Sequence, residues 1–220
     1  MRRDWPNATS IQSCKPRFPQ RESVLHLSNT GINALATPYK EAKFEVPRRI
    51  EPHELSTKDL ADILLKIVQQ EGPVHEDEVV NRARDLWGFA RAGGRIQDAV
   101  AKGVRSLIVT KRCTREEGFL SLPEAPIQIR TREDVNSLSL RKPEMLPLAE
   151  IRAAVLAVID AGHGATKDEL PVAVARLFGF KNTSAQLRSV LESQIGKLIR
   201  QGSVLETDGM LNRAEPPASN

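Results

Sequence analysis

The sequence predicts an α+β protein, mostly helical, in which a unit of three helices and a β-hairpin occurs twice in tandem. A shift of 91 positions lays Leu60–Leu120 over Ile151–Leu211 without a gap. Apolar residues recur at helical spacing in three stretches of each copy, and a glycine-containing turn between two short stretches closes each copy. A fixed offset over this length indicates a repeated supersecondary unit.

The first copy shows the helical pattern most clearly. Leu60, Ile63, Leu64 and Ile67 fall on one face of a helix, for which Ser56 is the expected N-cap. The other elements of this copy are expected at about Glu76–Leu86, ended by Gly88, at about Ala92–Ile108, and in a hairpin of Arg112–Arg115 and Phe119–Leu122 around Gly118.

The second copy repeats this order. Thr166 and Glu169 have capping-box spacing, but Pro171 would then cost a helical hydrogen bond. A helix that starts after Asp168 places Pro171 at the third helical position, where the missing N–H costs nothing, and we prefer that register. The elements are expected at about Leu148–Asp160, Asp168–Phe178, Thr183–Arg200, Ser203–Glu206 and Met210–Asn212.

The composition is that of a soluble globular protein, with 40% hydrophobic and 27% charged residues. No apolar run approaches the length of a membrane span, and no apolar segment follows the basic start as in a secretory signal. The two cysteines, Cys14 and Cys113, form no disulfide or metal framework, so we expect a reducing, cytoplasmic setting and no bound metal.

Composition and periodicity divide the chain into five parts. The boundaries are an irregular basic N-terminal arm at 1–50, the first unit at 51–122, a linker at 123–146, the second unit at 147–213 and a flexible tail at 214–220. The arm holds nine lysines and arginines against four acidic residues, and it is expected either to grip DNA non-specifically or to be a disordered leader.

Three helices followed by a hairpin is the plan of a winged helix, so we expect two tandem winged-helix-like units. In DNA-binding proteins of this plan the third helix enters the major groove, and the hairpin, or wing, lies beside it.

The residues also resemble a known family. Glu71–His75, Leu86–Gly93 and Arg141–Glu144 are similar to stretches of the bacterial domain of unknown function 3320, over roughly Tyr39–Arg213. That domain usually lies at the C-terminal end of large helicase-like proteins of superfamily I, often after a nuclease-like domain. The resemblance implies a DNA-associated context. The chain has no Gly-x-x-x-x-Gly-Lys-[Ser/Thr] phosphate loop, so it implies no ATPase activity here.

Basic residues gather on the third helix and wing of the first copy. Residues 91–115 contain seven basic side chains and one acidic, against four and one in 181–202 of the second copy. Such a cluster suits contact with phosphates, and it also suits a solvated helix face. The candidate DNA-binding residues are Arg91, Arg95, Lys102, Arg105, Lys111, Arg112 and Arg115, with Arg188 in the weaker second copy.

Other chemistry-bearing residues favour structural roles. Trp87 and Phe178 share one repeat position, where a core aromatic is expected rather than a base-stacking one. His75 has no second histidine four residues on, so a capping position is expected rather than a metal ligand. Cys113 is expected to be a small buried hydrophobe. No catalytic constellation is found, so neither enzymatic activity nor a cofactor is expected.

Two functional hypotheses follow. The first is a non-catalytic tandem winged-helix module that binds duplex or forked DNA, accessory to a helicase- or nuclease-linked process. The second is a protein-interaction module that docks a helicase-like partner or self-associates, which the charge-poor second copy favours. Neither hypothesis involves a membrane.

Overall fold

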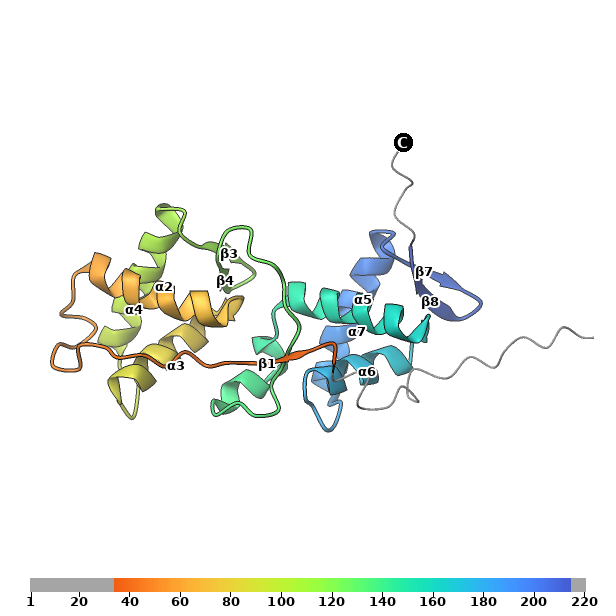
Figure 1. Cartoon of the computed structure of the whole chain (residues 1–220), viewed down its shortest axis with the longest axis horizontal. Coiled ribbons are helices and arrows are strands. Elements are labelled where there is room, and N and C mark those ends of the chain that lie inside the picture. The colour runs from red at the N-terminus through yellow and green to blue at the C-terminus, as the bar shows by residue number, and fades with distance from the viewer. Residues whose placement is uncertain (1–33, 215–220) are drawn as a thin grey trace, which may run out of the picture.

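The computed structural model describes residues 34–214, which form two units placed one after the other along the long axis (Figure 1). The fold is α+β, and about half of the described residues are helical. The first unit consists of α2 (Thr57–Glu71), β2 (Val74–His75), α3 (Glu76–Trp87), α4 (Gly94–Val109), β3 (Thr114–Glu116) and β4 (Phe119–Ser121). The second unit consists of α5 (Leu148–Gly162), β6 (Ala165–Thr166), α6 (Glu169–Leu177), α7 (Ala185–Arg200), β7 (Val204–Thr207) and β8 (Met210–Arg213).

The helix ends follow from local sequence. The hydroxyl of Ser56 accepts a hydrogen bond from the Asp59 N–H, so the predicted cap of α2 is confirmed. Helix α3 ends at Gly88, whose φ of 75° lies in the left-handed region that glycine adopts without strain. The side chain of His75 caps the start of α3 by accepting from the Asp77 N–H, as the position of this histidine predicted.

Helix α6 starts in the predicted register. Asp168 is its N-cap residue, which makes Pro171 the third helical residue, where no helical N–H bond is lost. The Thr166 hydroxyl still accepts from the Glu169 N–H and donates to the Glu169 carboxylate. The contacts of the capping box therefore form at the start of α6, although Thr166 is not the N-cap residue of this helix.

Each unit closes with a three-stranded antiparallel sheet rather than a plain hairpin. The strand orders are β2-β4-β3 and β6-β8-β7, and the predicted hairpins supply two strands of each sheet. The added strands, β2 and β6, have two residues each, which is too short for a period-two pattern to appear in the sequence. Both hairpin turns place two consecutive residues at positive φ, Glu117–Gly118 and Asp208–Gly209, as the tightest hairpin turns require.

Each unit has its own hydrophobic core. Ile96, Val100, Val104 and Leu107 of α4 point inward, and Val158 does the same on α5. Trp87 and Phe178 are both buried, and the Trp87 indole N–H donates to the carbonyl of Ile50 at 2.9 Å. The prediction that this repeated aromatic belongs to the core is confirmed.

The described part of the N-terminal arm, residues 34–50, is irregular in backbone but packs against the protein. Its two-residue strand β1 (Thr37–Pro38) pairs in parallel with β5 (Arg130–Thr131). Tyr39, Ala42 and Val46 are buried. The backbone of these residues is irregular as predicted, but the alternative of a disordered leader does not fit residues 34–50, because three side chains spaced three or four apart are buried. The rest of the predicted arm, 1–33, and residues 215–220 of the predicted tail lie outside the described residues.

The segment predicted as a linker is part of the junction between the units. It contains β5 and two 3₁₀ helices, η2 (Leu138–Arg141) and η3 (Pro143–Met145). Val135, Leu140 and Leu146 are buried. None of the helices in residues 34–214 is long and apolar enough to cross a membrane.

Candidate nucleic-acid interface

The outer face of α4 carries the strongest group of exposed cations. Arg95, Lys102 and Arg105 are exposed and project from the side opposite the buried stripe of Ile96, Val100 and Val104. Asp98 is the acidic residue on the same face. The helical period places three cations at offsets of seven and three, so they follow one another along the helix.

Two further exposed cations flank this helix in the chain. Arg91 is exposed in the loop before α4, and Lys111 is exposed directly after the helix, with φ of 56°. Within residues 34–214, none of the five cations Arg91, Arg95, Lys102, Arg105 and Lys111 forms an ion pair. We call these five residues the α4 basic cluster. Their positive charge is directed at solvent rather than neutralised by the protein.

The two arginines predicted on the wing do not belong to this cluster, because each pairs with a carboxylate. Arg112 is 2.5 Å from Asp62 of α2, and Arg115 is 2.9 Å from Glu76 of α3. The wing tip is formed by Glu116 and Glu117, which are both exposed. The sequence pattern missed these pairings because Asp62 and Glu76 lie far from the wing in the chain.

The second unit offers a weaker surface at the same place. Arg188 pairs with Glu192 four residues on, at 3.3 Å. At the repeat positions of Arg95, Lys102 and Arg105, the second unit has Gln186, Ser193 and Gly196. The two copies share a backbone plan and a core, but the helix-three face of the first carries more unpaired cations than that of the second.

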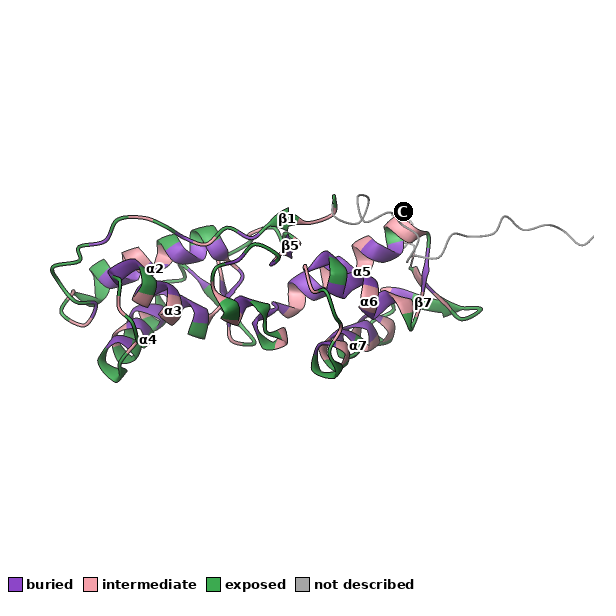
Figure 2. Ribbon diagram, turned by 90° about the horizontal axis from the view of Figure 1, so that it is seen from below, coloured by how far each residue is buried: buried purple, intermediate pink, exposed green. Residues whose placement is uncertain are grey.

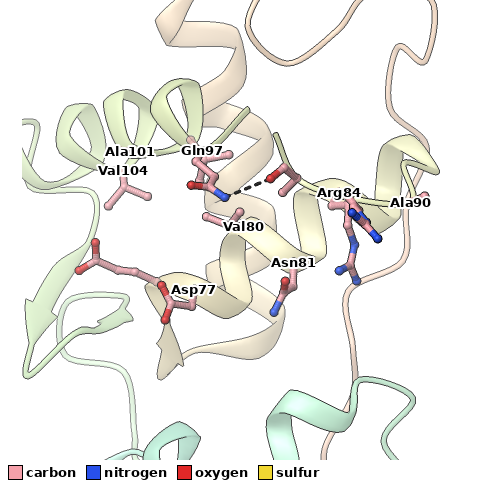
Figure 3. A pocket seen from close by; sticks show the side chains of 12 residues that line it. Asp77, Val80, Asn81, Arg84, Ala90, Gln97, Ala101 and Val104 are labelled. Atoms are coloured by element: carbon pink, nitrogen blue, oxygen red, sulfur yellow. Dashed lines mark hydrogen bonds between the residues drawn. The ribbon is translucent and has the colours of Figure 1, made fainter. Parts of the chain in front are cut away.

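A groove of about 490 Å³ runs between α3 and α4 (Figure 3). Val80 and Val104 line its apolar part, and the Gln97 amide donates to the Ala92 carbonyl at 3.0 Å on the wall formed by α4 and the loop before it. Asp77 lies toward one end and Arg84 toward the other. The groove is thus polarised, with an apolar floor.

A buried polar cluster in the first unit was not predicted. The Glu71 carboxylate has no exposed surface and accepts from the Tyr39 hydroxyl at 2.9 Å and from the Arg82 Nε at 2.5 Å. Arg82 also reaches Glu41 and Glu78, each at 3.3 Å. Burial, together with the neighbouring Glu71, raises the pKa of Tyr39 well above its ordinary value, so its hydroxyl stays a donor.

A sequence signal for this cluster does exist. Glu71 follows Leu64 and Ile67 on the apolar stripe of α2, and Arg82 lies between Val79 and Leu86 on the stripe of α3. Charged residues on two apolar stripes indicate a buried pair, since one alone would be costly. This arginine is therefore structural and does not extend the α4 basic cluster.

Metal-ligating and nucleophilic side chains are the other candidates for a site within residues 34–214. No group of three or more metal-ligating side chains occurs in the described part of the chain. Cys113 is a free buried thiol, and burial raises its pKa, which makes it a poor nucleophile. Its predicted burial is confirmed, and Cys14 lies outside the described residues.

Comparison with known protein families gives a match over part of the chain. Residues 51–98 match the family described as "Protein of unknown function (DUF3320)". The resemblance to this domain predicted from the sequence is confirmed over this stretch, which is less than a quarter of the chain and runs from before α2 into α4. Neither the curated proteins nor the solved structures give a match.

Proposed function

We propose that the chain is a non-catalytic module of two tandem winged helices that binds duplex DNA through the outer face of α4. Each unit has the order helix, strand, helix, helix, strand, strand, which is the order of a winged helix. In that plan the third helix is the groove-entering element, and here it carries the unpaired cations.

The α4 basic cluster is the observation that carries the proposal. Each cation that neutralises a phosphate releases condensed counterions, which favours binding at low salt. Arg95, Lys102 and Arg105 contribute no ion pair within residues 34–214, so bringing them to a phosphate breaks no salt bridge inside the described protein. Arginine adds bidentate geometry toward phosphate oxygens and guanine edges.

The wing contributes little to this binding. Glu116 and Glu117 at its tip would be repelled by phosphates, and Asp62 and Glu76 already neutralise Arg112 and Arg115. We therefore propose recognition led by the helix, with the wing turned away from the nucleic acid.

A helicase- or nuclease-linked process is the proposed setting. The match of residues 51–98 to DUF3320 supports this setting, because the resemblance of the chain to that domain implies a helicase- or nuclease-linked context. Forked duplexes are therefore included with plain duplexes among the expected ligands.

The test is a matched pair of charge reversals. In the first variant Arg95, Lys102 and Arg105 become Glu. In the control Lys40, Lys43 and Lys66 become Glu; all three are exposed, and Lys66 lies over the Phe44 ring of the N-terminal segment. The net charge changes equally, so a general charge effect cancels.

Duplex and forked DNA are then titrated by fluorescence anisotropy at low salt. The α4 variant is expected to lose at least about tenfold in affinity, while the control keeps most of it. Equal losses in the two variants, or no binding by the unaltered protein, would overturn the proposal.

A protein-interaction module is the second candidate. The groove between α3 and α4, with its apolar floor, and the lower charge of the outer face of α7 favour it. It predicts self-association in analytical ultracentrifugation, or binding to a purified helicase-like partner, with no affinity for DNA.

A further inference from the structure

We infer that the outer faces of α4 and α7 form one continuous surface and that a single DNA duplex lies along both. This inference rests on the proposed function, and it adds that the second unit binds the same nucleic acid as the first. It also predicts how long that nucleic acid must be.

The placement of the two third helices is the first argument. In Figure 2 both α4 and α7 lie along one long side of the molecule, while β1 and β5 lie on the other side. Figure 1 agrees, since α4 lies behind α2 and α7 lies behind α5. A straight ligand that follows one helix-three face along the long axis therefore meets the other.

The junction fixes this arrangement. The Arg130 guanidinium donates to the carbonyls of Glu71 at 2.7 Å and Pro73 at 3.0 Å, both in the first unit. The same group pairs at 3.3 Å with Glu150 of the second unit. Arg132 pairs with that carboxylate at 2.6 Å. All three ionic side chains are buried, so the link is shielded from solvent and salt.

The β1–β5 pairing strengthens the junction. It ties the N-terminal segment, whose Ala42 and Val46 are buried in the core of the first unit, to the strand that carries Arg130. These connections cross between the units on the side opposite α4 and α7. They hold the orientation without occupying the proposed surface.

The outer face of α7 can contact DNA through hydroxyl groups and a small number of cations. Ser189 and Ser193 are exposed hydroxyls, and Lys197 and Arg200 follow them toward the end of the helix. Neither Lys197 nor Arg200 has an ion-pair partner among residues 34–214. Serine hydroxyls donate to phosphates or to base edges, so the second unit adds hydrogen bonds with fewer released counterions than the first.

A duplex length requirement follows. One helix in a major groove covers about one turn, or about 10 base pairs, and two such contacts need at least about 20. Because a rigid junction makes the second contact intramolecular, affinity should rise steeply once the duplex spans both units.

The experiment compares three proteins on duplexes of about 12 and about 30 base pairs. They are the unaltered chain, a variant with Lys197→Glu and Arg200→Glu, and a control with Lys40→Glu and Lys43→Glu at exposed positions of the N-terminal segment after β1. Any binder finds more registers on a longer duplex. The deciding quantity is therefore the affinity of the α7 variant relative to the control at each length.

The expected result is a loss of about tenfold or more for the α7 variant on the long duplex and little change on the short one. Equal ratios at both lengths overturn the inference while leaving the proposed function in place. No binding of the unaltered chain to either duplex overturns the proposed function, and this inference with it. Circular dichroism of each variant excludes unfolding as the cause.

Discussion

Charged side chains in the described part of this protein divide into those neutralised by buried partners and those left unpaired at the surface. Arg82 and Arg95 are both arginines on helices of the first unit, yet Arg82 donates hydrogen bonds to three carboxylates and Arg95 faces solvent. Glu41 is one of the three, and it comes from the N-terminal segment. Its ionisation links the packing of that segment to pH.

The stability of the fold should fall in acid partly through Glu41. Burial alone raises the pKa of this carboxyl, but hydrogen bonds from Asn136 and Ser137 and the charge of Arg82 lower it below its ordinary 4.5. A lowered folded-state pKa stabilises the protein above 4.5, and this contribution is lost as pH falls through the folded value.

Urea unfolding between about pH 6 and about pH 3 tests this. The Glu41→Gln variant is expected to lose less stability over that range than the unaltered chain. The control is Glu45→Gln, at an exposed position nearby, and it should follow the unaltered chain. Identical slopes for Glu41→Gln and the unaltered chain would refute the role of this carboxyl.

At the scale of elements, the sequence predicted most of what forms locally. The Ser56 cap, the Asp168 start before Pro171 and the Gly88 end depend on residues within one or two turns, so their signals are readable in the chain. The strands β2 and β6 were missed because they exist only as partners of a distant hairpin. The pairing of Arg112 with Asp62 was missed for the same reason.

The cap of α2 gives a test at this scale. Ser56→Ala removes the hydroxyl that satisfies the Asp59 N–H, and it should lower the free energy of unfolding by about 1 kcal/mol. Thr57→Ala at the neighbouring exposed position is the control and should change it by less than about 0.5 kcal/mol. Thermal and urea unfolding of both variants measure the difference. An equal effect of the two substitutions would contradict the cap.

For the whole molecule, the repeat produces a shared plan with unequal surfaces. The sequence showed the two copies and the excess of charge on the first, since both are properties of order and composition. It did not show that the linker arginines Arg130 and Arg132 are buried on Glu150, because that contact needs both units in place. The structure of the junction is therefore the feature that was hardest to predict from the sequence.

Glu150→Gln tests that junction. The substitution keeps the size of the side chain but leaves two buried arginines without their shared carboxylate. We expect the free energy of unfolding to fall by about 3–5 kcal/mol. Glu133→Gln, at an exposed position in the segment that carries Arg130 and Arg132, is the control and should have little effect. A change below about 1 kcal/mol for Glu150→Gln would show that the junction contributes little to stability.

The salt dependence of duplex binding tests the central claim most directly, because its slope counts the cations that meet phosphates. If the five residues of the α4 basic cluster all make such contacts, the logarithm of the affinity falls against the logarithm of salt concentration with a slope approaching about −4.5. Reversing Arg95, Lys102 and Arg105 should flatten that slope by about 3. A slope near zero for the unaltered protein, or one that the reversal leaves unchanged, would contradict the assignment of α4 as the DNA-binding face.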